Sequence, residues 1–186
     1  MGHLEVVREA LRSGLDQLVV MPCRVSPHKL QTPALGAMED RWAMLELAFH
    51  DVANVSLSRH ELDGPVPSYT YKTLAHLQKK HPGARLMLIL GLDQLHSLDR
   101  WARYGEWAAH IGFLAFNREG SPAIDLPKKY AKLDLQFIEK KVSPLSSSSI
   151  RERIRRGQGI DGLVTPAVER YIRQHHLYTP PKQPSL

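Results

Sequence analysis

The stretch Leu86-Met87-Leu88-Ile89-Leu90-Gly91-Leu92-Asp93 decides the fold of this 186-residue chain. Its first five residues are all apolar, as expected for a strand that is covered on both faces. Gly91 then lets a ligand approach the backbone closely, and the Asp93 carboxylate can accept from ribose hydroxyl groups or simply cap a helix. We therefore predict a buried parallel strand that ends at a binding site.

On both sides of this strand in the sequence, apolar runs alternate with segments of helical periodicity. Further strands are predicted at 17–21, 55–58, 111–116 and 135–138. Helices are predicted at 4–11, 38–49, 70–81, 149–154 and 166–172, with a short polar helix around Trp101. This alternation predicts an α/β, three-layer, Rossmann-like domain with a mainly parallel sheet. We expect one domain over residues 1–178, a mobile linker at 30–36, a loop or weak helix at 121–134, and a disordered tail at 179–186.

Composition narrows the class of protein. No apolar run approaches the roughly 18 residues of a membrane span, so no membrane partner is expected. The formal charge of +6 favours anionic ligands. Because the Lys and Arg residues are scattered, we favour a nucleotide ligand and expect no nucleic acid partner. The single cysteine, Cys23, excludes an intramolecular disulfide and favours a cytoplasmic protein.

Four consecutive hydroxyl residues, Ser146 to Ser149, precede Ile150 and Arg151. Ser149 and Glu152 have the spacing of a capping box, which predicts a helix start there. Free N–H groups and hydroxyls at a helix start can bind an anion, and the Arg151 guanidinium can add a forked donor to the same phosphate. A polar N-cap with a solvated arginine is the alternative interpretation.

Other polar clusters also follow predicted strands. The loop at 22–29 is rich in proline and in basic or titratable groups, and it suits either ligand contact or plain solvation. Ser68 and Thr70 can cap the next helix or present hydroxyls to a ligand. Trp101 is a core residue or a stacking platform. Arg118 follows the strand at 111–116. These positions predict a nucleotide-sized cleft at one rim of the sheet.

Taken together, these clusters resemble the motifs of the nicotinate-nucleotide adenylyltransferases over nearly the whole chain. The matching segments are Gly2-His3 (the second half of H-x-G-H), Ser26-Pro27-His28-Lys29, Ser68-Tyr69-Thr70-Tyr71-Lys72-Thr73-Leu74, Gly91-Leu92-Asp93 with Trp101, Ser146 to Arg151, and Tyr171-Ile172 with His176-Leu177-Tyr178. Ser148 stands in place of a threonine and Ser26 in place of a proline.

The resemblance implies that the phosphate of nicotinate mononucleotide attacks the α-phosphorus of ATP, with Mg²⁺ accompanying the pyrophosphate that leaves. It implies three catalytic residues: His3, Lys29 and Arg151. It implies that ATP contacts Gly91, Asp93, Arg118, Ser146, Ser147 and Ser148. It also implies that the nicotinate carboxylate is held by Thr70 and the N–H of Ala102, while Trp101 stacks on the ring. No residue is expected to bind a metal ion directly, and a homo-oligomer is compatible with the pattern.

The family also has a strand and a G-G-T-F-D-P-x-H segment before the Gly-His pair, and neither precedes Gly2 here. We therefore expect that Met1 is an internal residue of a longer protein and that the first, central strand is missing from the sheet. Two alternatives stay open. One is a nucleotide-binding protein of the same fold that has lost turnover, and the other is adenylyl transfer to nicotinamide mononucleotide.

Overall fold

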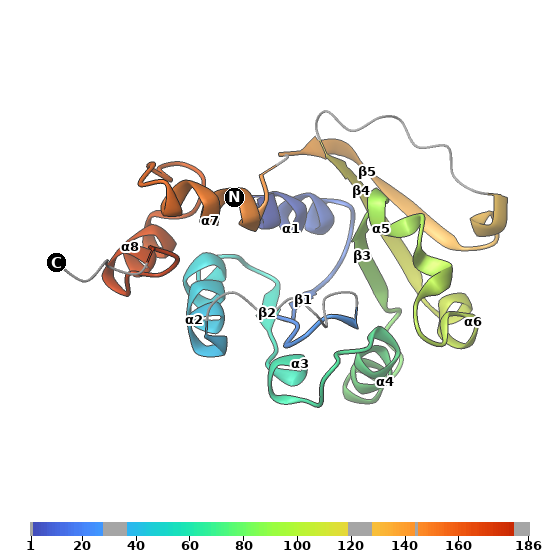
Figure 1. The fold of residues 1–186 in the computed structure, drawn as a ribbon. Helices are drawn as coiled ribbons and strands as arrows, with labels where there is room; N and C mark the ends of the chain where they lie inside the picture. The colour runs from blue at the N-terminus through green and yellow to red at the C-terminus, as the bar shows by residue number, and fades with distance from the viewer. Residues whose placement is uncertain (1, 28–36, 119–127, 144, 181–186) are drawn as a thin grey trace, which may run out of the picture.

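The computed structural model describes residues 2–27, 37–118, 128–143 and 145–180, without the side chains of residues 118, 129 and 139–142 (Figure 1). The strands are β1 (Leu18–Val20), β2 (Val55–Leu57), β3 (Met87–Gly91), β4 (Gly112–Arg118) and β5 (Asp134–Val142). The α-helices are α1 (Gly2–Arg12), α2 (Met38–Phe49), α3 (His60–Asp63), α4 (Thr70–Lys80), α5 (Leu92–Leu95), α6 (Tyr104–Trp107), α7 (Ser147–Arg155) and α8 (Pro166–Gln174). The 3-10 helices are η2 (Leu98–Arg100), η3 (Ala108–His110) and η4 (Lys128–Tyr130).

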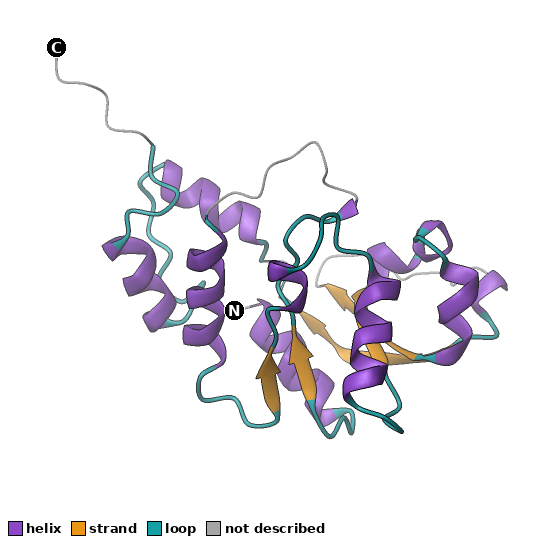
Figure 2. Cartoon of the chain, turned by 90° about the horizontal axis from the view of Figure 1, so that it is seen from below, coloured by secondary structure: helices purple, strands orange, loops and turns teal. Residues whose placement is uncertain are grey.

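In the described part of the chain all strand pairs are parallel, as predicted, and the strands form two separate sheets. β1 pairs with β2, starting with Leu18 beside Val55. β4 lies between β3 and β5 in the second sheet. Within the described residues no strand joins the two sheets by backbone pairing. The arrows of both sheets point toward the same side of the molecule in Figure 2, so the loops that follow the strands gather on that side.

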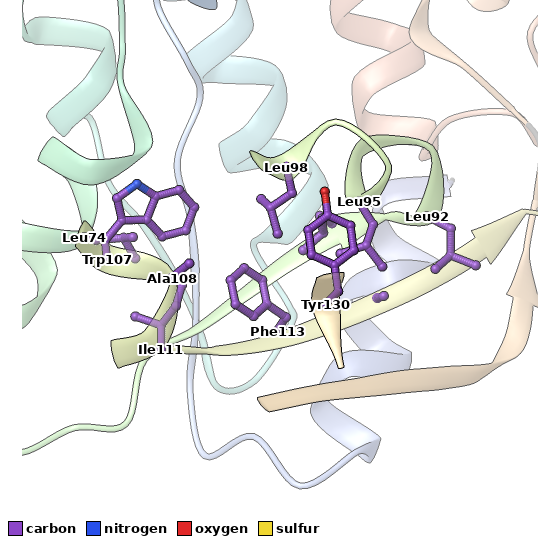
Figure 3. Close-up of a cluster of buried hydrophobic side chains, with 11 residues drawn as sticks. Leu74, Leu92, Leu95, Leu98, Trp107, Ala108, Ile111, Phe113 and Tyr130 are labelled. Atoms are coloured by element: carbon purple, nitrogen blue, oxygen red, sulfur yellow. The ribbon is translucent and has the colours of Figure 1, made fainter. Parts of the chain in front are cut away.

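A large apolar cluster covers one face of the three-stranded sheet. Phe113 of β4 is fully buried in it, together with Leu98, Leu95 and Trp107 from the segment between β3 and β4. Figure 3 shows the Trp107, Phe113 and Tyr130 rings along this face. The Tyr130 hydroxyl donates to the Asp99 carboxylate over 2.9 Å, which satisfies the polar end of a buried side chain.

Helix α1 covers the other face and contacts both sheets. Its buried residues Leu4 and Val7 belong to one cluster with Leu18 of β1 and Leu114 of β4. Because α1 packs on strands from both sheets, the two sheets share one apolar layer, and the domain has the predicted three layers. A third cluster joins α8 to α7 and α2 around Val168 and Ile172.

Several boundaries differ from the sequence prediction. β5 continues four residues beyond Ile138. The short helix α3 was not predicted. Trp101 does not lie in a helix but ends η2 and begins a turn before α6. Residues 30–36, 121–127 and 181–186, for which a linker, a loop and a tail were predicted, lie outside the described residues. None of the helices described is both long and apolar enough to cross a membrane.

Candidate active site

The predicted serine-rich helix start is present, but the cap is different. Ser146, not Ser149, is the N-cap of α7, and its hydroxyl accepts a hydrogen bond from the Ser149 N–H over 3.0 Å. Ser149 completes the capping box with a 3.2 Å bond from the Ser146 N–H to its hydroxyl oxygen. Glu152 is not part of this box and instead pairs with Arg156 at 2.8 Å. The helix itself provides no partner for the N–H groups of Ser147 and Ser148, which therefore suit an anion.

Arg151 lies one turn into α7 and is held from two sides. Its Nη2 donates to the Ser148 hydroxyl over 3.0 Å, and its guanidinium carbon lies 5.9 Å from the centroid of the Tyr178 ring. Its Nε is buried and has no hydrogen-bond partner. Burial raises the pKa of the Tyr178 phenol. Tyr178 is therefore uncharged, and its ring contacts the Arg151 guanidinium. The Nη2 atom of the same guanidinium reaches the serine cluster through Ser148.

The start of α1 lies beside this serine cluster. A Cβ atom added to Gly2 would lie 3.3 Å from the carbonyl oxygen of Leu145, so the two backbones lie close together there. Glu5, one turn into α1, accepts a 2.9 Å hydrogen bond from the N–H of Ser143. These contacts join two segments that are more than 130 residues apart in sequence, and they place exposed His3 at the same end of the fold as Ser146.

Gly91 ends β3 beside the side chain of Asp93, whose exposed carboxylate could move aside for a larger residue. The Gly91 φ of −71° is available to any residue, so conformational freedom is not the reason for glycine. A Cβ atom at this position would collide with Oδ1 of Asp93 and approach the Phe116 ring to 3.6 Å. The exposed Asp93 carboxylate therefore leans back over the strand end, where it can accept hydrogen bonds from a ligand.

The loop after β1 is tied to the segment before α4. The N–H of Ser68 donates to the Val25 carbonyl oxygen over 2.9 Å. Arg41 of α2 donates to the Cys23 carbonyl oxygen over 2.6 Å, so its side chain holds this loop against α2. Burial raises the pKa of the Cys23 thiol, so this side chain is neutral. Neither Ser68 nor Thr70 is the N-cap of α4; that position belongs to Tyr69.

Several side-chain contacts help to hold the turn at residues 101–103. The Trp107 indole Nε1 donates to the Ala102 carbonyl oxygen over 3.1 Å. The guanidinium carbon of Arg103 lies 4.9 Å from the centroid of the Tyr71 ring in the first turn of α4. Arg103 also binds Glu106 through two hydrogen bonds, of which the Nε–Oε1 bond measures 2.8 Å. The Arg103 guanidinium lowers the pKa of the Glu106 carboxyl group, so the pair is charged at neutral pH.

Two predicted site residues cannot be placed in full. Lys29 lies outside the described residues, and Arg118 is described only as the last residue of β4. A hollow of about 250 Å³ lies between the ends of α7 and α8, and none of the predicted site residues lines it. In the parts of the chain that the structure describes, no three His, Cys, Asp or Glu side chains are grouped so that they could hold a metal ion.

Sequence reasoning gave no role to four side chains that support the predicted site: Tyr71, Arg103, Trp107 and Tyr178. Tyr71 and Tyr178 were noted only as members of matching segments. Tyr71 and Arg103 each directly follow a predicted site residue, and that adjacency was the available signal. The left-handed backbone of Arg103, with φ of 58°, had no signal, because arginine is not a residue that favours this region.

The chain is similar to several known proteins. A family model described as Cytidylyltransferase-like matches residues 1–153. A probable nicotinate-nucleotide adenylyltransferase from Synechococcus sp. (strain JA-3-3Ab) is 38% identical over 186 residues, which span 97% of this chain and 89% of the relative. The chain belongs to the nicotinate-nucleotide adenylyltransferase family. A second member, from Geobacillus thermodenitrificans, is 34% identical over 95% of this chain and 79% of its own length.

Solved structures of this family have the same fold. The nicotinic acid mononucleotide adenylyltransferase of Plasmodium falciparum, in a complex with NaAD, superposes with a TM-score of 0.73 at 21% identity. That superposition covers 94% of this chain and 89% of the other. A putative nicotinate-nucleotide adenylyltransferase from Vibrio parahaemolyticus gives a TM-score of 0.65 at 19% identity, covering 95% of this chain and 86% of the other. At such identities the likeness establishes the Rossmann-like fold.

Proposed function

We propose that this chain transfers the adenylyl group of ATP to nicotinate mononucleotide, forming deamido-NAD and pyrophosphate. The observation that carries the proposal is the approach of Gly2 to the Leu145 carbonyl oxygen, which brings the Gly-His pair to the serine-rich start of α7. Relatives that are named for this reaction span nearly the whole chain, which supports the same conclusion.

The donor side holds the phosphates of ATP. Backbone N–H groups at the start of α7 and the hydroxyls of Ser146, Ser147 and Ser148 suit the β- and γ-phosphates. Arg151 adds a permanent positive charge, which Tyr178 keeps in place. His3 donates to the α-phosphate as charge develops on its oxygens. Gly91 leaves room for the adenosine at the end of β3, and Asp93 accepts from its ribose. In this proposal Arg118 also faces the nucleotide, and Lys29 approaches the phosphates shared by the two substrates.

The acceptor side holds nicotinate mononucleotide. The Ala102 N–H and the Thr70 hydroxyl donate to its carboxylate, and the Trp101 indole stacks on the pyridine ring. Trp101 is only half-buried, with its inner edge against the large apolar cluster, so part of the ring is available to a ligand. The tie between Ser68 and Val25 brings the loop after β1 to this side, where it can reach the phosphates of both substrates.

The reaction needs positioning more than covalent chemistry. A phosphate oxygen of the mononucleotide forms a bond to the α-phosphorus of ATP. The bond between that phosphorus and the bridging oxygen to the β-phosphate breaks, and pyrophosphate leaves with the electron pair. Cationic and N–H donors lower the barrier because they stabilise the charge that spreads over the phosphoryl oxygens. The donors at the start of α7 suit phosphate oxygens rather than a metal ion, so we assign none of them to Mg²⁺, which enters with ATP.

Formation of deamido-NAD and pyrophosphate from ATP, Mg²⁺ and nicotinate mononucleotide tests the proposal directly. We expect equal amounts of the two products and no pyrophosphate when the mononucleotide is omitted. Saturable ATP binding without either product would contradict the proposal and favour a binding protein. A higher kcat/KM with nicotinamide mononucleotide would assign the amide as the acceptor instead.

A further inference from the structure

Two residues next to the acceptor site are in contact with each other. Tyr71 directly follows Thr70 in the first turn of α4, and Arg103 directly follows Ala102 in the turn before α6. The guanidinium carbon of Arg103 lies 4.9 Å from the centroid of the Tyr71 ring, well within the range of a cation–π contact. This contact therefore links the two segments that supply the proposed donors to the nicotinate carboxylate.

We propose that the Tyr71–Arg103 pair is a positioning device that sets the distance between Thr70 and the Ala102 N–H, and so determines affinity for the mononucleotide. This inference rests on the function proposed above. Neither side chain is assigned contact with substrate. Their effect is exerted through the neighbouring residue on each segment.

The backbone of Arg103 supports this role. Its φ of 58° and ψ of 27° lie in the left-handed region, which costs free energy for any residue with a Cβ atom. Such a conformation persists where surrounding contacts over-determine it. The Tyr71 ring and the Glu106 carboxylate supply such contacts, one on the ring face and one through two hydrogen bonds. Arg103, the strained residue, immediately follows Ala102, whose N–H must point toward the nicotinate carboxylate in the proposed site.

The two partners differ in how firmly they are held. Tyr71 packs against the large apolar cluster, so its ring is a fixed platform. Arg103 has more than half of its side chain exposed, so only its partners hold it in place. Two hydrogen bonds to Glu106 orient the plane of the Arg103 guanidinium, and the face of the Tyr71 ring packs against it. Removal of either the ring or the cation should therefore loosen the 101–103 turn, while the hydrogen bond from Trp107 to the Ala102 carbonyl oxygen remains.

The experiment measures KM for nicotinate mononucleotide and for ATP in Arg103→Ala, Tyr71→Leu, Tyr71→Phe and the Arg103→Ala/Tyr71→Leu double variant. Arg103→Ala and Tyr71→Leu should each raise KM for the mononucleotide by about threefold to tenfold, the range for loss of one cation–π contact. KM for ATP should stay unchanged. Tyr71→Phe keeps the ring face but loses the hydroxyl, which also interacts with Arg103, so its KM for the mononucleotide should lie between the values of the wild type and Tyr71→Leu. The double variant should be no worse than either single one.

Lys72→Ala is the matched control. The Lys72 ammonium lies 5.8 Å from the centroid of the Tyr69 ring in the same helical turn, but this contact does not reach the 101–103 turn. The Lys72→Ala substitution removes a cation from an aromatic face but leaves the Tyr71–Arg103 contact in place. KM for the mononucleotide should therefore not change.

Arg103→Gly separates positioning from folding. Glycine adopts the left-handed conformation without strain, so its Tm should equal or exceed that of Arg103→Ala. KM for the mononucleotide should nevertheless rise as it does in Arg103→Ala. Failure of the wild type to bind the mononucleotide would overturn this inference and the proposed function together. A normal wild type with an unchanged KM in Arg103→Ala, or with equal rises for both substrates, would overturn the positioning role alone.

Discussion

The Trp107 indole Nε1 donates a 3.1 Å hydrogen bond to the carbonyl oxygen of Ala102, the residue whose N–H faces the acceptor carboxylate in the proposed site. Trp107 is buried in the large apolar cluster, and its ring also packs near Trp101, with centroids 6.4 Å apart. One core residue thus supports both the amide donor and the stacking platform. Through Trp107 the apolar core is in direct contact with two residues of the proposed acceptor site.

The Trp107→Phe substitution should test that contact. The smaller phenyl ring would fill most of the apolar space but has no N–H, so the Ala102 carbonyl loses its donor. We expect a loss of about 1–3 kcal/mol of stability from the missing bond and the smaller ring. KM for nicotinate mononucleotide should rise, while KM for ATP stays unchanged. Trp42→Phe, in α2, is the control, since it makes the same chemical change outside the acceptor side.

Loss of the Arg151 side chain should weaken ATP use specifically. A charge-assisted hydrogen bond contributes about 1.5–3 kcal/mol, so Arg151→Ala should raise KM for ATP by roughly tenfold or more. Thermal unfolding should change little, because the contacts described for Arg151 are one hydrogen bond to the Ser148 hydroxyl and one long cation–π contact with Tyr178, and neither is an ion pair. Arg155→Ala, in the last turn of the same helix, should leave KM for ATP unchanged. A large fall in Tm with normal KM would show that Arg151 is structural.

Trp101 should behave as a stacking platform. Stacking of a base on an aromatic ring contributes about 1–3 kcal/mol, so Trp101→Ala should raise KM for the mononucleotide by roughly fivefold or more. Trp101→Phe retains a ring face and should recover most of that loss. Intrinsic fluorescence gives a second measurement, because the mononucleotide should quench the wild type and not Trp101→Phe. An unchanged KM in Trp101→Ala would remove the stacking assignment.

The sequence predicted the elements whose signals are local. Four of the five residues in the apolar run at 86–90 lie in β3, which begins at Met87, and Pro166 is the first residue of α8 as expected. β5 was predicted too short because charged residues at 139–141 interrupt the apolar pattern, although the backbone pairing with β4 continues past them. Pairing depends on the neighbouring strand, which local patterns do not report.

The residue types of the site could be predicted from the sequence, but the contacts that hold those residues in place could not. Among four consecutive serines, each can serve as an N-cap, so local sequence could not choose Ser146 over Ser149. The choice depends on where the chain turns after β5, and the contact of Glu5 with the Ser143 N–H helps to fix that turn. The left-handed conformation of Arg103 likewise depends on Tyr71, more than 30 residues away. Such supports require the assembled fold.

Acidification should weaken the packing of α3 on α4. The rings of His60 and His76 stack with centroids 3.6 Å apart. Burial, and then the nearby charges of His60, Lys80, His81 and Lys79, lower the pKa of His76. The folded state therefore favours the neutral His76 ring.

A lowered pKa in the folded state fixes the sign of the pH effect. The contribution of His76 to stability is fully present above the ordinary histidine pKa of 6.5 and is lost as pH falls through that value and below it. We expect Tm to fall between about pH 7.5 and pH 5.5, and His76→Phe, which keeps a stacked ring without a titrating group, to reduce that fall. His96→Phe, at an exposed position in another element, is the control and should leave the pH dependence unchanged. A His76→Phe profile parallel to that of the wild type would show that this pair is not the source of the pH dependence.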